Sequence, residues 1–395
     1  MSHAAIAIPG LDRIGGAEQQ AMMLAKGLRR RGWRVSVVAL SGTGGAAAAE
    51  LADAGVAFHS LEMRKGLADP RGWLRFHRWL RHRQPDVVHA HLPHAAWLAR
   101  WSRLAAPVPI VVDTLHSSAT GKMGRHFGYA CSRWLPDHVT AVSQATAASH
   151  AAAGMVDPSR LSVLGNGIDV NRWQPNARAR LEARQELGIK NSFLWLAVGR
   201  LEAVKDYPTL LNALARAPQT AKLTAQLLVL GAGPLQVELD NMAAGLGLGQ
   251  RVYFAGFYPN VARWMQAADG FVLSSRYEGL PMVLLEAGAC GLPAVATDVP
   301  GTREVLVDGE TGWLVPAGDP ERLAVAMSRL MHHPLNERRA IGERARQHVV
   351  EHFSLEAVLD RWERLYADLL ERKNPKRRSD RTEWESLRRR SAHTA

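Results

Sequence analysis

Cysteine is scarce in this chain. Cys131 and Cys290 are the only two among 395 residues, and each lies among apolar neighbours far from the other. So few thiols exclude a disulfide framework and a cysteine-based zinc cluster. We expect both to be buried core residues of a protein that works in a reducing compartment.

Long hydrophobic runs are also absent. No uncharged stretch approaches the roughly 18 residues that span a bilayer. The opening MSHAAIAIPG runs straight into a glycine-rich turn, unlike a secretory signal. The sequence therefore predicts a cytoplasmic protein, at most peripheral on the inner face of the cytoplasmic membrane.

Acidic residues are in the minority, because 37 Asp and Glu stand against 49 Lys and Arg, for a formal net charge of +12. This excess favours anionic partners such as nucleic acid, an anionic membrane surface or phosphorylated substrates. The sequence contains no recognisable nucleic-acid-binding module, so we expect no nucleic acid partner. Residues 373–395 form a basic tail.

Two missing motifs narrow the chemistry further. No D-x-D occurs, so a metal clamp on a diphosphate has no evident counterpart, and no G-x-G-x-x-G is completed, which disfavours a nicotinamide enzyme. His89 and His91 share one face of an expected strand, but no cysteine or carboxylate cluster completes a zinc set. We expect neither a metal nor a bound cofactor.

Short β-branched runs alternate with longer amphipathic segments along the whole chain, which predicts βαβ units and an α/β fold. At this length two domains are expected. We place a Rossmann-like domain at 1–172 and a second at 190–353, with a helix at 354–372, capped by Ser354, packing back toward the first. Strands are predicted at 4–10, 34–40, 56–61, 86–91, 109–116, 138–143 and 161–167, and at 193–201, 226–233, 252–257, 270–275 and 293–297.

The segment from Ser274 to Thr302 contains the most informative pattern. A strand ends there, a Gly-Pro turn follows, and a short helix starts near Pro281, with Glu278 before it and Glu286 in its second turn. A helix N-terminus attracts a pyrophosphate, while flanking carboxylates accept hydrogen bonds from sugar hydroxyls. The alternative is a helix-dipole carboxylate and a solvated one.

Two further turns offer groups for a phosphate. Arg200 and Lys205 follow a strand and can neutralise a diphosphate leaving group, although a pair of surface cations is the alternative. Gly15 and Gly16 precede a helix and let backbone amides approach a phosphate closely, unless they only form a tight loop.

The stretch EGLPMVLLEAGACGLPAVAT resembles the E-x7-E signature of family 4 glycosyltransferases, and G-R-L followed by Lys205 resembles their phosphate-binding pair. The resemblance implies a GT-B fold, in which two Rossmann-like domains face each other across a cleft. It implies that Glu278 contacts the donor sugar, that Glu286 contacts the ribose, and that His116 orients the sugar. The other implied donor-site residues are Gly15, Gly16, Gly231, Gly233, Phe257, Gly279, Leu280, Pro281 and Met282.

The resemblance also implies the reaction. We expect a retaining hexosyltransferase that uses a nucleoside diphosphate sugar, with a UDP-sugar favoured over a GDP-sugar. Its acceptor would be a cell-surface glycan, such as lipopolysaccharide or exopolysaccharide, or a polyprenyl-linked sugar. A nucleotide-sugar epimerase, a glycan phosphorylase and a non-catalytic sugar-nucleotide-binding protein remain alternatives.

The segment 71–83 has five arginines and no acid, with Trp73, Phe76 and Leu80 on one helical face. It could lie on an anionic membrane leaflet, which would suit a lipid-linked acceptor. The alternative is that its apolar face covers the sheet while the arginines are solvated.

Overall fold

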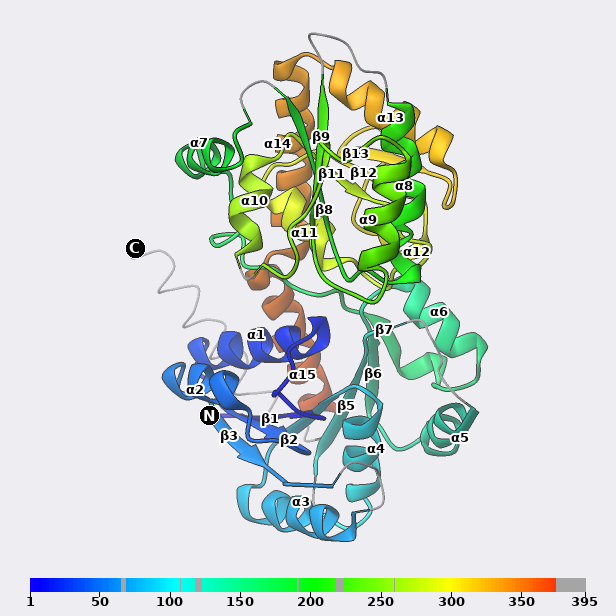
Figure 1. Cartoon of the computed structure of the whole chain (residues 1–395). Coiled ribbons are helices and arrows are strands. Elements are labelled where there is room, and N and C mark those ends of the chain that lie inside the picture. Colours follow the sequence, from blue (N-terminus) through cyan, green and yellow to red (C-terminus); the bar gives the residue numbers. More distant parts are fainter. Residues whose placement is uncertain are drawn as a thin grey trace, which may run out of the picture. The chain divides into compact units, whose positions relative to one another are not determined.

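The computed structural model describes residues 1–64, 69–106, 108–117, 123–189, 192–217, 224–258 and 260–373 (Figure 1). The basic tail lies outside these residues, apart from its first residue. The chain forms two compact units, each with its own parallel sheet. The first unit contains Met1–Val142, Thr146–Leu164 and the chain from Val358 on, and the second contains Ser143–Ala145 and Gly165–Ala357.

The sheet of the first unit has seven parallel strands in the order β3-β2-β1-β4-β5-β6-β7. Its central strands are almost entirely buried, as near-continuous apolar runs covered on both faces should be. The strands are β1 (His3–Ile8), β2 (Arg34–Ala39), β3 (Ala57–Ser60), β4 (Val87–His91), β5 (Ile110–Leu115), β6 (His138–Ala141) and β7 (Leu161–Val163).

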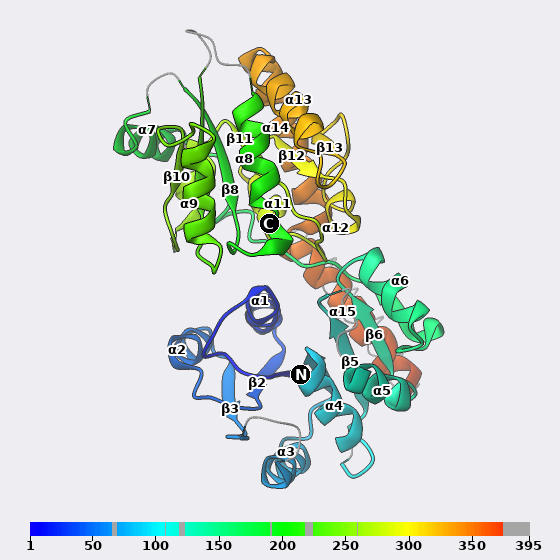
Figure 2. The same ribbon diagram turned by 45° about the vertical axis from the view of Figure 1, so that its right-hand side comes forward.

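Helices cover both faces of this sheet (Figure 2). One core cluster joins the sheet to α3, α4, α5 and α6 and contains Phe76, Leu80 and Tyr129. The helices of the unit are α1 (Gly16–Arg30), α2 (Gly45–Asp53), α3 (Pro70–Arg83), α4 (Pro93–Ser102), α5 (Met123–Ser132), α6 (Gln144–Ala152), the 3-10 turn η1 (Pro158–Arg160) and most of α15 (Leu355–Lys373).

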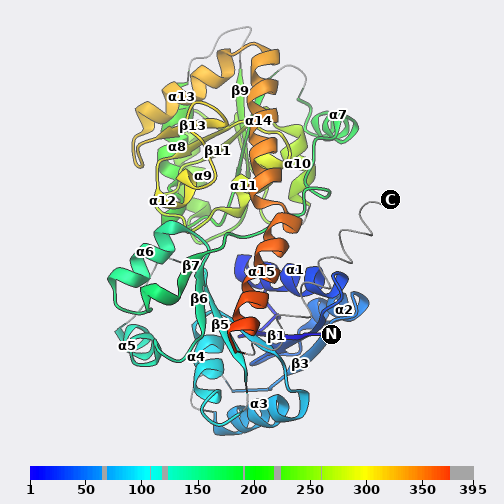
Figure 3. The same ribbon diagram turned by 180° about the vertical axis from the view of Figure 1, so that it is seen from behind.

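The last helix, α15, lies beside α1 (Figure 3). Ser354 Oγ accepts a hydrogen bond from Ala357 N at 3.3 Å, which confirms the predicted cap. Tyr366 is fully buried, and its hydroxyl lies 2.6 Å from His89 Nδ1 on β4. The part of α15 from Val358 onward therefore packs in the core of the first unit.

The sheet of the second unit has six parallel strands in the order β10-β9-β8-β11-β12-β13. The sequence predicted five of them and missed β13, a run of four residues that is too short for a period to be recognised. The strands are β8 (Phe193–Val198), β9 (Ala225–Leu230), β10 (Val252–Phe254), β11 (Gly270–Leu273), β12 (Ala294–Thr297) and β13 (Gly312–Val315).

Helices α8, α9 and α13 lie on one face of the second sheet, and α7, α10, α11 and α14 lie on the other. A cluster around Trp195 and Leu210 forms the core under α8 and α13. The helices are α7 (Ala177–Glu186), the 3-10 turn η2 (Ala203–Lys205), α8 (Tyr207–Arg216), α9 (Gln236–Gly245), α10 (Val261–Ala267), α11 (Met282–Ala289), α12 (Pro300–Arg303), α13 (Pro320–His332) and α14 (Leu335–Phe353).

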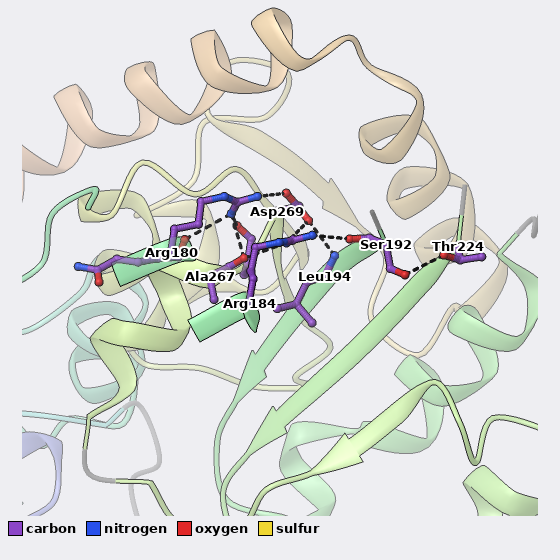
Figure 4. Close-up of polar contacts among 9 residues, drawn as sticks. Arg180, Arg184, Ser192, Leu194, Thr224, Ala267 and Asp269 are labelled. Atoms are coloured by element: carbon purple, nitrogen blue, oxygen red, sulfur yellow. Dashed lines mark hydrogen bonds and ion pairs between the residues drawn. The ribbon is translucent and has the colours of Figure 1, made fainter. Parts of the chain in front are cut away.

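Helix α7 is held to the amino ends of β8 and β11 by one carboxylate (Figure 4). Asp269 accepts from Arg180 at 2.5 Å and from Arg184 at 2.9 Å, and also from Leu194 N at 2.9 Å. We expected the second domain to begin at residue 190. These contacts instead place the arginine-rich stretch before it in the second unit.

The two cysteines differ in environment. Cys290 is buried, as expected, whereas Cys131 is exposed near the end of α5. The prediction of a buried Cys131 was therefore wrong. Its apolar neighbours in sequence do not determine which face of a helix turns inward.

Candidate functional site

The second sheet changes direction of winding between β8 and β11. From β8 the chain continues outward to β9 and β10, while β11, β12 and β13 lie on the other side. Open parallel sheets bind ligands outside the carboxyl ends of their strands at such a switch point. The loops after β8, β9 and β11 contain most of the residues predicted for the donor.

Lys205 and Glu278 meet at this point. Lys205 is the last residue of η2, after β8, and its Nζ lies 2.6 Å from Glu278 Oε1 in the loop after β11. The Ser275 hydroxyl donates to the same oxygen at 2.6 Å. Both side chains are mostly buried, at 18% and 12% exposure, so this ion pair is shielded from solvent and strongly oriented.

The two loops are tied together next to this pair. Ser274 Oγ donates to the Lys205 carbonyl at 2.8 Å, and Arg276 N donates to the Val204 carbonyl at 2.9 Å. Asp206, which is 2% exposed, accepts from Arg276 Nε at 2.9 Å. These contacts hold the lysine and the glutamate in position before any ligand arrives.

Glycines allow the loop after β9 to approach the loop after β8. Gly231 has φ +147°, and a Cβ there would lie 1.9 Å from the Gly199 carbonyl oxygen. A Cβ on Gly233 would lie 2.4 Å from the Leu201 carbonyl oxygen. Both predicted glycines are therefore required by close backbone approach, whatever they contact in a ligand.

Helix α11 begins where the sequence predicted. Pro281 is its N-cap residue and offers no side-chain acceptor to the first amides. Gly279 and the buried Leu280 precede it, and Met282 is its first residue. A Cβ on Gly301 of α12 would lie 2.6 Å from the carbonyl oxygens of Glu278 and Gly279, so α12 packs directly on this turn.

Glu286 has a different environment from Glu278. Its side chain makes no hydrogen bond within the described part of the chain. Burial raises the pKa of Glu286 to about 8, and the opposing effect of the Arg172 charge is smaller. The carboxyl group is therefore mostly protonated at pH 7, and it can accept a hydroxyl hydrogen bond more strongly once it ionises.

Two predicted residues do not join this cluster. The Arg200 side chain is 74% exposed and pairs with Glu202 at 2.7 Å. Phe257 is 82% exposed. The carbonyl of its neighbour Gly256 accepts a hydrogen bond from Gly231 N at 2.8 Å, which connects the loop after β9 to the loop after β10. The roles of Arg200 and Phe257 remain predictions.

Sequence reasoning assigned no role to Ser275 or Gly301, although both lie in the segment that it singled out. The hydroxyl of Ser275 is close enough to Glu278 in sequence for a loop contact to be anticipated. Gly301 follows a proline, which indicates a turn but does not identify what the glycine packs against.

The first unit places His116 at the end of β5. His116 Nε2 lies 2.9 Å from His91 Nδ1, and burial lowers the pKa of His116 to about 4. Burial also lowers the pKa of His91, so both rings are neutral at pH 7. Nε2 of His91 is buried without a partner among the described residues. A buried donor without a partner is rarer than a buried acceptor. This favours donation from His91 Nδ1 to His116, which leaves the His116 proton on Nδ1.

The predicted glycine turn of the first unit lies at the start of α1. Gly15 is the N-cap residue, and its amide donates to Glu18 Oε2 at 3.0 Å. Gly16 has open space where a Cβ would stand. A phosphate bound at the Gly15 amide would therefore displace the Glu18 carboxylate.

The described residues contain no group of three or more His, Cys, Asp or Glu side chains arranged to hold a metal ion. None of the helices in the described ranges combines the length and the apolar character needed to cross a bilayer.

Comparison with known proteins gives matches over both units. Residues 14–172 match the family model described as Glycosyltransferase Family 4, and residues 179–348 match the one described as Glycosyl transferases group 1. N-acetyl-alpha-D-glucosaminyl L-malate synthase of Bacillus anthracis is 31% identical over 72% of this chain and 75% of that protein.

Two further proteins are similar over most of the chain. UDP-Gal:alpha-D-GlcNAc-diphosphoundecaprenol alpha-1,3-galactosyltransferase of Escherichia coli is 25% identical over 77% of this chain and 81% of its own. The crystal structure of Anabaena Alr3699/HepE in complex with UDP has a TM-score of 0.81 and 23% identity, covering 93% of this chain and all of that one. The predicted two-domain α/β GT-B fold is confirmed.

Proposed function

Because this chain belongs to the family 4 glycosyltransferases, we propose that it is a retaining hexosyltransferase that uses a nucleoside diphosphate sugar. UDP is favoured over GDP because the Anabaena protein was crystallised with UDP. The name of the Escherichia coli relative gives a UDP-galactose donor and an acceptor on diphosphoundecaprenol. We therefore propose a cell-surface glycan or a lipid-linked sugar as the acceptor.

The observation that supports this proposal best is the buried pair of Lys205 and Glu278 at the switch point of the second sheet. A cation and a carboxylate 2.6 Å apart suit the two halves of a nucleotide sugar. The ammonium group has three N–H donors and can hold a diphosphate oxygen while it keeps its contact with Glu278. The carboxylate, oriented by Ser275, accepts from sugar hydroxyls.

The proposed chemistry is a front-face displacement. The bond between the anomeric carbon and the diphosphate oxygen breaks, and the acceptor oxygen forms its bond on the same face. The acceptor proton passes to the departing diphosphate, which acts as the base. Lys205, Arg200 and the N-terminus of α11 stabilise the negative charge that develops on that diphosphate.

We propose that no metal or other cofactor takes part, because these cationic groups serve the diphosphate instead. Transfer should then continue in excess chelator. Glu286 would accept from the ribose hydroxyls, and His116, Gly15 and Gly16 would act from the first unit as the family resemblance implies.

We further propose that the protein works in the cytoplasm, at the inner face of the membrane. The exposed arginines of α3, including Arg71 and Arg78, support this because they would attract anionic lipid.

Replacing Lys205 by Ala tests the proposal. Loss of one group that stabilises the leaving charge should lower kcat about 10²- to 10³-fold, measured as transfer from a panel of UDP- and GDP-sugars. Glu278→Gln should lower kcat by a similar factor. The matched control is Lys26→Ala, because Lys26 also pairs with a glutamate, Glu50, but lies in the first unit. Full turnover in Lys205→Ala would contradict the assignment.

Assays of the wild-type protein with different substrates distinguish the alternative functions. An epimerase converts the donor without an acceptor, and a phosphorylase releases a sugar phosphate from glycan and inorganic phosphate. A non-catalytic binding protein would show neither transfer nor donor hydrolysis. Any of these results would replace the proposed function.

A further inference from the structure

The first unit contains a pocket of about 500 Å³ that none of the roles above uses. Pro9, after β1, and Leu40 and Ser41, after β2, form one part of its wall. The rest comes from Met63 and Arg64, which follow β3, and from α3 and α4. In the strand order of this sheet, the direction of winding changes between β1 and β4. The pocket therefore lies where an open parallel sheet binds ligands.

The lining of this pocket is dominated by indole rings. Trp73 of α3 and Trp97 and Trp101 of α4 contribute to it, together with Met63 and Leu98. Trp101 is 43% exposed although it borders an apolar cavity. Three tryptophans around one cavity offer a large apolar surface for a ligand to cover.

Few polar side chains line the same space: Ser41, Arg64 and His94. A sugar ring would bring several hydroxyl groups, and each one buried without a partner would weaken its binding. A hydrocarbon chain needs no such partners and gains from every apolar contact. The lining therefore favours an apolar chain over a glycan.

The positive charge beside the pocket indicates what the chain is attached to. Arg64 is exposed and lines the pocket. Helix α3, which supplies Trp73, contains five arginines and no acid, although none of these arginines lines the pocket itself. A ligand with an apolar chain and an anionic head would satisfy both the cavity and this charge.

We propose that this pocket binds the apolar chain of a prenyl phosphate or diphosphate, the carrier of the acceptor sugar. This inference rests on the proposed transferase function, because it identifies the acceptor of that reaction. It assigns the chain to the indole-lined cavity and the phosphate to Arg64 in its lining.

The test is binding of a chain-length series to the full-length protein without any nucleotide sugar. Pyrophosphate, isopentenyl, geranyl and farnesyl diphosphate are titrated against the intrinsic tryptophan fluorescence. The dissociation constant should fall at least about tenfold from pyrophosphate to farnesyl diphosphate, with saturable binding of one ligand per chain. Equal affinity along the series would overturn the proposal.

Two variants separate the chain site from the phosphate site. Trp101→Ala should remove most of the chain-length dependence, whereas Arg64→Gln should weaken every member of the series by the same factor. Trp134→Ala is the control, because Trp134 is 56% exposed in the same unit but lies outside the pocket. If Trp101→Ala keeps the wild-type dependence, or if binding does not saturate, the chain adsorbs elsewhere, on the surface or in micelles, and the proposal fails.

The outcome can be told apart from failure of the proposed function, since the binding assay contains no donor. Saturable, chain-dependent binding without any sugar transfer would refute the transferase and leave the pocket assignment intact. Transfer to soluble glycans together with a flat chain-length series would support the transferase and refute the pocket assignment.

Discussion

Individual residues in the candidate donor site differ in how they are prepared for a ligand. Glu278 is engaged with Lys205 and Ser275. Glu286, eight positions later and on helix α11, is held mostly in its neutral form by burial. The two carboxyl groups of one motif therefore lie in different environments, because only Glu278 has a cation within contact distance.

This difference predicts that donor affinity depends on pH through Glu286. If ribose hydroxyls bind the ionised carboxylate, binding must first remove a proton below pH 8. The dissociation constant for UDP should then fall by up to about tenfold per pH unit from pH 6 toward 8 and level off above it. Calorimetry at several pH values measures this.

Glu286→Gln is the control, and it should remove that part of the pH dependence. The same raised pKa affects stability. The contribution of the neutral Glu286 side chain to folding stability is fully present below the ordinary glutamate pKa and is lost as pH rises through about 8. Glu286→Gln should therefore be more stable to urea than wild type at pH 9 and similar to it at pH 4. A wild-type profile in Glu286→Gln would contradict the assignment.

At the scale of elements, the packing of α15 against α1 depends on a glycine in α1. A Cβ on Gly27 of α1 would lie 2.5 Å from Leu359 Cδ1 of α15. Arg31 and Trp33, at the end of α1 and just beyond it, both hydrogen-bond to Glu363 of α15. The two helices can approach this closely only because position 27 is glycine.

Gly27→Ala should therefore destabilise the protein by about 1–3 kcal/mol, because overpacking outweighs the gain in helix propensity. The control is Gly245→Ala in α9, where a Cβ would meet nothing within 4 Å. That substitution should be neutral or stabilising. Urea unfolding of both variants provides the comparison, and Leu359→Ala in the Gly27→Ala background should recover part of the loss. Equal stability of the two alanine variants would refute this account of the docking.

At the scale of the whole molecule, each unit has its own sheet and its own shielded ion pairs, which are fully buried in the first unit and partly buried in the second. Asp269 binds Arg180 and Arg184 in the second unit, and Asp113 binds Arg100 in the first, where both side chains are fully buried. Units with separate cores need not unfold together, so a single free energy of unfolding need not describe the chain.

We expect two unfolding transitions by calorimetry, which single substitutions shift separately. Asp269→Asn should lower the free energy of unfolding of the second unit by about 3 kcal/mol, because it leaves two shielded guanidinium groups without their carboxylate. Asp113→Asn should lower the free energy of unfolding of the first unit.

The control is Arg178→Ala on α7, whose ion pair with Glu182 is exposed and should contribute almost nothing. A single transition that shifts equally in both aspartate variants would show that the units unfold as one.

Local pattern was sufficient for most of the elements, although it missed β13. The alternation of apolar runs with amphipathic segments predicted the parallel α/β architecture, the start of α11 near Pro281 and the Ser354 cap, because these depend on residues a few positions apart. The resemblance around Glu278 also predicted the family, which the family models confirm.

Only the tertiary structure determined which side chains contact one another. Lys205 and Glu278 are 73 residues apart and meet because β8 and β11 are neighbours in the sheet. Nothing in the local sequence tells that Arg200 is solvated, that Cys131 faces outward or that Asp269 captures two arginines of α7. Periodicity determines which residues form a strand or a helix, whereas burial, pKa and ion pairing depend on which segments the chain brings together.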